Sequence, residues 1–310
     1  MEKCIKVSAI VSTYNSARFI QSCIVDLQRQ TIAAQLEIIV IDSGSEENEG
    51  AIVKDFALRY DNIVYLRTEQ REGLYTAWNR AIKMAKGKYI TNANTDDRHH
   101  PSSFEILSKQ LDDSDAFILA YHDQIISDIE NETFEECLAR NTRRQTYPDF
   151  SHETLILGCL TGSQPMWRKS AHLQYGYFSE EYKIAADYEF WLRISQTNSF
   201  LHIRNALGLF YDSPDTLSGS NNRFKVDTET VRIQLEYLEK FPWSVKPSNR
   251  INLSSTIFRI GYHYVEIRQD LRSAKEFLWQ AWKLNFLNLN FAKTFIIRGL
   301  LKFHYGLGKR

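Results

Sequence analysis

Short apolar runs of β type alternate with amphipathic stretches over the first 120 residues, and this alternation is the feature that most constrains the fold. The runs typical of buried strands are residues 7–13, 37–41, 63–67, 88–93 and 115–121. Between them, apolar residues recur at helical spacing within residues 16–30, 52–60 and 73–85, with Gly87 at a C-cap-like position, and Pro101 fits the first turn of a further helix. Such alternation predicts a mostly parallel α/β sheet that binds ligands at the carboxyl ends of its strands.

The next hundred residues are less regular. Residues 123–144 are polar, acid-rich and weakly periodic, so they predict an irregular excursion. Residues 164–169 predict a strand, and residues 185–196 a strongly amphipathic helix. Residues 205–224 carry Gly, Ser, Asn and Pro and therefore predict a loop.

Beyond Val226 aromatic and aliphatic residues recur at helical spacing to the end of the chain. We therefore expect two units, residues 1–224 with the α/β pattern and a helical region of residues 225–310. From residue 241 onward there are twelve Lys or Arg and three Asp or Glu, and no acid follows Glu276. This cationic end is a candidate contact for an anionic lipid surface or an acidic partner. Packing of residues 291–305 on the protein itself or on a partner subunit is an equally open alternative.

Composition excludes several classes of protein. Thirty-eight basic residues balance thirty-eight acidic ones, so net charge provides no field for a nucleic acid partner. No apolar run approaches the roughly eighteen residues of a transmembrane helix, and the N-terminus lacks the pattern of a signal peptide. The scattered Cys4, Cys23, Cys137 and Cys159 indicate reduced, buried thiols. We expect a cytoplasmic protein, soluble or peripheral at the inner face of the membrane.

Polar clusters follow the first two predicted strands. Thr13, Tyr14 and Asn15 offer a hydroxyl, a ring and an amide suited to a nucleoside, although a helix cap is the plainer interpretation of this turn. Asp42 and Ser43 begin the second cluster, where a carboxylate is suited to accept a hydrogen bond from a nucleobase. An ordinary Asx-turn explains that cluster about as well.

A third cluster surrounds the start of the third predicted helix. Gly73 there allows close approach of a phosphate to backbone N–H groups, and Arg71 adds a positive charge. The alternative is a plain loop-to-helix junction with Trp78 in the core.

The fourth cluster, residues 94–97, reads Asn-Thr-Asp-Asp at the end of a β-type run. Mg²⁺ or Mn²⁺ is held by one or two carboxylates plus substrate phosphates, and the Asp pair fits that need. A turn followed by a helix cap is the alternative. The adjacent His99 and His100 are expected at the surface.

Asp187 opens the predicted helix of residues 185–196, with Trp191 one turn later. A carboxylate at this place fits a general base that deprotonates an acceptor hydroxyl, with Trp191 as a platform for a sugar ring. An acidic first helical turn, which the helix dipole favours, is the plainer alternative.

Taken in order, these clusters resemble the family 2 glycosyltransferases of the GT-A fold over roughly residues 5–220. The matching segments are Val-Ser-Thr-Tyr-Asn (11–15), Ile-Asp-Ser-Gly-Ser (41–45), Gly73 with Ala77 and Asn79, the residues Ala85, Gly87, Tyr89 and Ile90, and Asn-Thr-Asp-Asp (94–97) at the DxD position. Tyr211 and residues 213–220 match the family's late active-site loop loosely. The chain departs from the family at Asn94, where the first Asp is commoner, at Trp78, where Arg is usual, and at Ala186, where Glu is usual.

The resemblance implies a role for each matched residue. Asp42 would contact the base, Asp96 would bind the metal, and Asp187 would be the catalytic base. Asn94 would lie near ribose or phosphate, and Asp97 near the donor sugar or the acceptor.

The function this implies is a metal-dependent, inverting transfer of a sugar from a UDP-, GDP- or dTDP-linked donor to a carbohydrate or lipid-linked acceptor, in synthesis of surface polysaccharide or glycoconjugate. Two alternatives stay open. A nucleotidyltransferase would want a Gly-rich, basic loop after the first strand, which residues 12–15 do not supply. A non-catalytic nucleotide-sugar binder or scaffold would not need both Asp96 and Asp187.

Overall fold

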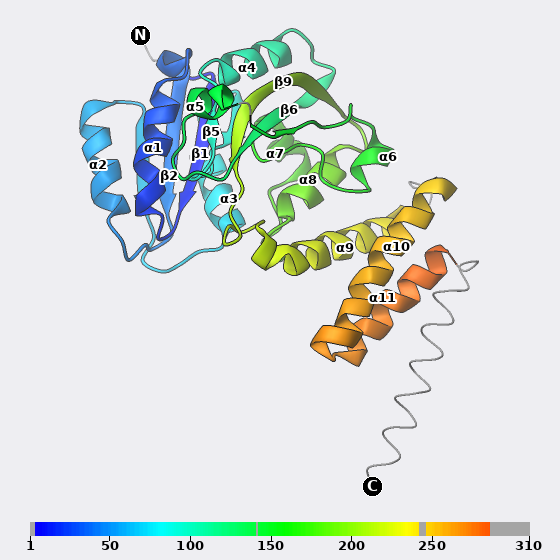
Figure 1. Cartoon of the computed structure of the whole chain (residues 1–310). Helices are drawn as coiled ribbons and strands as arrows, with labels where there is room; N and C mark the ends of the chain where they lie inside the picture. The colour runs from blue at the N-terminus through cyan, green and yellow to red at the C-terminus, as the bar shows by residue number, and fades with distance from the viewer. Residues whose placement is uncertain (1–3, 141, 242–245, 286–310) are drawn as a thin grey trace. The chain divides into compact units, whose positions relative to one another are not determined.

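The computed structural model describes residues 4–140, 142–241 and 246–285, which form two compact units (Figure 1). The sheet unit comprises the residues up to Leu155 together with Cys159–Asn222. The helical unit comprises Ile156–Gly158 and the described residues from Arg223 onward.

The sheet unit is built on one mixed sheet in the order β3-β2-β1-β4-β8-β6-β9-β5, with β7 paired to β6. The bounds are β1 Val7–Thr13, β2 Leu36–Asp42, β3 Ile63–Arg67, β4 Tyr89–Asn92, β5 Arg98–His99, β6 Phe117–Ser127, β7 Arg144–Gln145, β8 Met166–Arg168 and β9 Ser199–Tyr211. Strands β1 to β4 pair in parallel, whereas β8 is antiparallel to both β4 and β6. The four parallel strands therefore end at one edge of the sheet.

Helices cover the sheet because their apolar stripes match its buried strands. They are α1 Ala17–Gln28, α2 Glu49–Arg59, α3 Leu74–Met84, α4 Ser103–Asp112, α5 Phe134–Ala139, α6 His152–Leu155, α7 Ser170–Tyr175 and α8 Ala186–Ile194. Helix α1 buries Ile20, Ile24 and Leu27 in one cluster with Val7 and Ala9 of β1, and residues of α2 and α4 join this cluster. Fully burying such a side chain stabilises the fold by about 1.5–3 kcal/mol. Helix α3 packs on β1 and β2 outside that cluster.

Two segments differ from the sequence-based expectation. The supposedly irregular stretch from residue 123 is β6 as far as Ser127, followed by α5, and the supposed loop from residue 205 is strand as far as Tyr211. Both errors have one cause, since β6 and β9 pair with each other along almost their whole length, with irregular register near His122 and Asp123. Strand preference depends on cross-strand partners, so glycine and polar residues are tolerated here.

Gly208 shows why a residue typical of loops sits in β9. A Cβ at this position would overlap the side chain of Gln164. The Gln164 amide donates to the carbonyl oxygens of Arg98, 3.0 Å away, and Leu209, 3.3 Å away. Glycine therefore makes room for a buried amide that ties β5 and β9 together.

Three smaller expectations are wrong. Cys4 and Cys159 are exposed, although all four cysteines are free thiols. His99 is buried. Its Nδ1 lies 3.0 Å from Asp26 Oδ2, and its ring packs edge-on against Phe104. Gly87 is not a left-handed cap, since its φ is not positive. A Cβ there would lie 2.7 Å from Ser8 N, so this glycine serves a close approach to β1.

The helical unit contains α9 Arg223–Lys240, α10 Pro247–His263, a π-helical turn Tyr264–Arg268 and α11 Leu271–Leu284. Its core is formed by Val231, Leu253, Ile257, Ile260, Phe277 and Ala281. Among the described residues, no helix has the length and apolarity required to cross a bilayer. The cationic stretch of residues 291–305 lies outside the described residues.

Candidate active site

The loops that follow β1 and β2 are joined by their own backbones. Ser43 N–H donates to the Thr13 carbonyl at 3.0 Å, and Asn15 N–H donates to Ser45 Oγ at 3.2 Å. Asn15 has a φ of 48°, a left-handed conformation that Asn tolerates better than most residues. The hydroxyls of Thr13 and Ser43 are buried and have no partner among the described residues. This edge of the sheet thus presents two hydroxyl groups that have no hydrogen-bond partner among the described residues.

Asp42 ends β2 and is fully buried. Its Oδ1 accepts from Ser45 N–H at 2.8 Å, and its Oδ2 accepts from the Tyr65 hydroxyl at 2.7 Å and the Arg67 guanidinium at 3.0 Å. Burial by itself raises the pKa of this carboxyl, but the hydrogen bonds from Ser45 and Tyr65 and the charge of Arg67 outweigh it, so the pKa is lowered. Asp42 is therefore an anion whose orientation is set by β3. The contacts of Tyr65 and Arg67 with Asp42 were not predicted from the sequence.

The loop after β3 packs on the other two. Arg71 lies over the ring of Tyr14 with 4.1 Å between the guanidinium carbon and the ring centroid. Gly44 has a φ of +72°, and a Cβ there would meet the Gln70 backbone at 3.1 Å. Gly73 caps α3 in an extended conformation, and a Cβ there would meet only Thr76 Oγ1, at 3.8 Å. Among the described residues, the place that a Cβ would take at Gly73 is therefore not filled by another group.

The Asn94–Asp97 turn ends β4 beside the end of β9. Asp97 is buried, and it accepts from Asn94 Nδ2 at 3.0 Å and from the backbone N–H of Tyr211 at 3.1 Å. Burial raises the pKa of Asp97 to about 7, and the neighbouring charge of Asp96 adds to this rise. Asp96 is partly exposed, and burial raises its pKa as well, while Arg98 and Arg18 oppose the rise. Two carboxylates that repel each other this closely favour a cation between or beside them.

Arg98 is a buried cation that the sequence analysis missed. Its guanidinium donates to the carbonyl oxygens of Thr95 at 2.8 Å and Asp97 at 2.5 Å, and to Asn131 Oδ1 at 2.7 Å. Arg98 therefore stabilises the turn that carries Asp96 and Asp97. The sequence around Arg98 contains no pattern that distinguishes a buried arginine from a surface arginine.

A metal at this turn would depend on the Asp pair. In residues 4–140, 142–241 and 246–285, no three His, Cys, Asp or Glu side chains gather in a way that would hold a metal ion. Hard divalent cations accept one or two carboxylates when substrate phosphates and water complete the shell. The Asp96–Asp97 pair fits that kind of site and does not fit an all-protein cage.

Asp187 lies in the first turn of α8, where the helix dipole favours a negative charge. The hydroxyl of Tyr75, from the start of α3, lies 2.8 Å from Asp187 Oδ1 and 2.6 Å from the Ile184 carbonyl oxygen, and these two acceptors share its one proton. Tyr75 is held by its ring, which packs on Trp78 and Phe178. Nothing in the sequence pattern singled out Tyr75 for this contact.

Asp187 is linked through the Tyr75 hydroxyl to the start of α3, which follows β3. The Asp97 turn follows β4, which runs parallel to β1 in the same sheet. Both segments therefore follow strands that end at one edge of the sheet.

Two predicted participants lie elsewhere. Asn79 is buried, and its amide donates to the Phe178 carbonyl at 2.9 Å and accepts from Phe178 N–H at 3.1 Å, so this side chain serves the loop before α8. Trp191 is 1% exposed and packs on Trp167 and Phe190. The prediction of a sugar-stacking surface at Trp191 is wrong, because the indole belongs to the core.

A mixed α/β sheet whose parallel strands end in polar clusters is typical of nucleotide-binding enzymes, and comparison with known proteins gives the family. The model of glycosyl transferase family 2 matches residues 8–175. The chain belongs to glycosyltransferase family 2. This confirms the resemblance inferred from the sequence motifs.

Curated relatives share part of the chain. Glycosyltransferase GlyG of Streptococcus pneumoniae serotype 4 is 32% identical over 113 residues, which are 36% of this chain and 37% of that protein. Chondroitin synthase of Pasteurella multocida is 27% identical over 227 residues, 72% of this chain and 22% of that protein. The matched regions thus span well under half the length of these relatives.

Solved structures confirm the fold. S. aureus TarS, residues 1–349, has a TM-score of 0.57 at 18% identity, covering 88% of this chain and 90% of that one. Mannosyltransferase PcManGT from Pyrobaculum calidifontis, solved in complex with GDP-Man and Mn²⁺, has a TM-score of 0.58 at 14% identity, covering 96% of this chain and 80% of that one. The predicted α/β fold of GT-A type is confirmed.

Proposed function

We propose that this glycosyltransferase moves a sugar from a nucleotide-diphosphate donor to an acceptor hydroxyl in one metal-dependent displacement that inverts the anomeric carbon. The observation that supports the proposal is that the Asp96–Asp97 turn follows β4, and that Asp187 contacts Tyr75 at the start of α3, which follows the parallel strand β3. A single displacement needs a charge sink for the leaving diphosphate and a base on the opposite side of the sugar.

The donor's nucleoside is assigned to the loops after β1 and β2. Asp42, locked as an anion, and the unsatisfied hydroxyls of Thr13 and Ser43 offer acceptors and donors to a base and ribose. A buried hydroxyl without a partner costs about 1–3 kcal/mol, which a bound ligand would recover. Tyr14 and Asn15 belong to the same proposed nucleoside site.

The diphosphate is assigned to the backbone at Gly73 and to the turn after β4. Arg71 supplies a positive charge there, and the open space at Gly73 permits close approach to the start of α3. Asp96, with Asp97 and Asn94 beside it, would hold Mg²⁺ or Mn²⁺. Such an ion supplies positive charge that neutralises the departing diphosphate.

Asp187 is assigned the role of base. Its carboxylate would take the proton of the acceptor hydroxyl as that oxygen bonds to the anomeric carbon and the bond from this carbon to the phosphate oxygen breaks. The Tyr75 hydroxyl contacts one oxygen of this carboxylate and helps to orient it.

The substrate class is proposed from relatives. Two structures similar in fold are complexes with nucleotide sugars, TarS with UDP-GlcNAc and PcManGT with GDP-Man. Relatives in sequence include a chondroitin synthase and a hyaluronan synthase. We therefore assign a UDP-, GDP- or dTDP-sugar as donor and a growing polysaccharide or lipid-linked glycan as acceptor. The sheet unit, close to the predicted residues 1–224, would carry the chemistry, with residues 225–310 as an accessory region.

The proposal is tested by separating donor binding from turnover. The thermal shift caused by UDP-, GDP- and dTDP-sugars is measured with Mn²⁺ and with EDTA, in the wild type and in Asp96→Asn and Asp187→Asn variants. Asp96→Asn should lose the metal-dependent stabilisation, because it removes one of the two charges that hold the ion. Asp187→Asn should keep that stabilisation while turnover falls by about a hundredfold or more.

Ser102→Ala, before α4, is a control expected to change neither quantity. Manganese-dependent donor binding that survives in Asp96→Asn would reject the metal assignment. Full turnover in Asp187→Asn would place the base elsewhere. Tight donor binding without any transfer or hydrolysis would support the alternative of a non-catalytic binder.

A further inference from the structure

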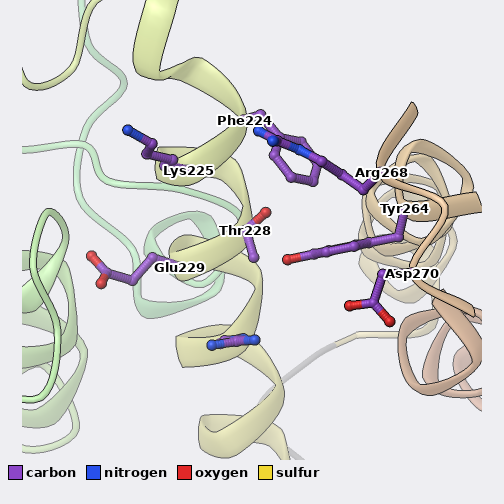
Figure 2. Close-up of a pocket in the computed structure, with 8 residues that line it drawn as sticks. Phe224, Lys225, Thr228, Glu229, Tyr264, Arg268 and Asp270 are labelled. Atoms are coloured by element: carbon purple, nitrogen blue, oxygen red, sulfur yellow. The ribbon is translucent and has the colours of Figure 1, made fainter. Parts of the chain in front are cut away.

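The helical unit contains a pocket of about 430 Å³ that belongs to none of the machinery described above. One wall is the face of α9 that carries Lys225, Thr228 and Arg232, spaced by three and four residues. The π-helical turn supplies the other wall, with Tyr264 and Arg268 (Figure 2). Single π-helical turns occur frequently at functional sites.

Thr228 is the residue that indicates a ligand. It is 8% exposed, and its hydroxyl is buried with no hydrogen-bond partner in the part of the chain that the structure describes. Figure 2 shows Thr228 and Tyr264 pointing toward one another across the pocket. A buried donor left without an acceptor is costly, so the site is suited to a molecule that brings acceptor atoms.

The charge of the lining favours an anion. Three cations, Lys225, Arg232 and Arg268, line the pocket with two carboxylates, Glu229 and Asp270. Asp270 is the N-cap of α11, and its Oδ1 accepts hydrogen bonds from the N–H groups of Arg272 and Ser273, both at 3.1 Å. Its charge is thus balanced by the helix dipole, and the cations outnumber the remaining acid.

The aromatic rings argue against a stacked sugar or base. Phe224 stacks on His263 with 3.7 Å between centroids, and the Arg268 guanidinium lies over the same ring at 5.4 Å. Tyr264 stacks on Phe277, so one face of its ring is covered too. The rings therefore position Arg268 and the Tyr264 hydroxyl rather than offering a platform.

We propose that this pocket of the helical unit binds a phosphate group, as a phosphate monoester or a diphosphate, independently of the donor site. Arg268 and Arg232 would donate to the phosphate oxygens, in the forked geometry that guanidinium groups make with such anions. Thr228 and Tyr264 would add neutral hydroxyl donors. The phosphate arrives either free, on a soluble ligand, or as the headgroup of a lipid.

The test titrates the full chain with inorganic phosphate and pyrophosphate by calorimetry, in EDTA so that no metal assists binding at the donor site. Arg268→Gln should weaken binding about tenfold or more, the usual cost of losing a charged hydrogen bond. Thr228→Val, which keeps the shape of the side chain, should weaken it about fivefold. Arg268 is exposed, so its variant tests the site even if the buried Thr228 variant fails to fold.

Two controls separate the pocket from general charge and from the donor site. Arg259→Gln removes an exposed cation of α10 that does not line the pocket, and Asp96→Asn alters the proposed metal site. Both should bind phosphate as the wild type does. Equal weakening in Arg259→Gln and Arg268→Gln would overturn the proposal, because only net charge would then matter.

Vesicles distinguish the source of the phosphate. Flotation compares phosphatidylcholine vesicles with a roughly four-to-one mixture of phosphatidylcholine and phosphatidic acid. Flotation on the mixture that is lost in Arg268→Gln, without binding of free phosphate, would assign a lipid headgroup. Binding of free phosphate without flotation would assign a soluble ligand. Absence of both, or insensitivity of both to Arg268→Gln, would overturn the pocket assignment.

Discussion

At the scale of single residues, the hydroxyl of Tyr75 is the contact that best separates positioning from chemistry. This hydroxyl contacts Asp187 Oδ1 and the Ile184 carbonyl oxygen, while the ring of Tyr75 is packed on Trp78 and Phe178. Tyr75→Phe should therefore keep the fold and the donor KM but lower kcat about tenfold, the effect of losing one hydrogen bond to a charged group. Steady-state kinetics with a saturating acceptor measures both constants. An unchanged kcat would mean that Asp187 needs no such support.

A second residue-scale prediction concerns His172, whose ring is buried against Phe190. Burial lowers the pKa of His172 to about 4, and the neutral ring accepts from Trp167 Nε1–H at 2.8 Å. The unfolded state takes up the proton near pH 6.5 and the folded state only near 4, so stability is lost as the pH falls between these values. The loss is at most about 3 kcal/mol.

Urea unfolding from pH 7 to pH 4 measures this loss in the wild type and in His172→Gln, which does not titrate. The difference between the two proteins should shrink as the pH falls. His122, whose pKa burial also lowers to about 4, contributes equally to both and cancels. A difference that stays constant with pH would show that His172 is not the titrating group.

At the scale of secondary-structure elements, the long pairing of β6 with β9 decides the second half of the sheet unit. Gly208→Ala in β9 should lower the free energy of unfolding by about 1–3 kcal/mol, because the new methyl group displaces Gln164. Gly158→Ala is the matched control, since a Cβ there meets nothing within 4 Å. Urea denaturation of the two variants checks this. Equal stabilities would show that β9 relaxes without cost.

At the scale of the whole molecule, the two units have separate cores and should respond to different ligands. Calorimetric scans are expected to contain two transitions. A donor nucleotide with Mn²⁺ should raise only that of the sheet unit, by about 2.7 kcal/mol of stability at a hundred times Kd. Inorganic phosphate in EDTA should raise only that of the helical unit. One transition that moves with either ligand would show that the units unfold together.

The sequence alone determined the strand-helix order of the first hundred residues. The bounds of β1 and β3 agree with the runs of residues 7–13 and 63–67. For β1 the reason is that a parallel strand buried on both faces favours apolar side chains along its whole length. The same reasoning located the turn clusters, since polar residues directly after such runs lie at the edge of the sheet. These features are local, so neighbouring residues are enough to encode them.

Only the tertiary structure decided which polar residues support one another. The partners of Asp42 on β3, of Asp187 on α3 and of the Asp97 turn on β9 lie between 23 and 114 residues away in the chain. The burial of His99 beside Asp26 and the pairing of Gly208 with Gln124 also join residues that are far apart in the sequence. No periodicity records such pairings, because they arise when separate elements compete for the same core and the same unsatisfied hydrogen bonds.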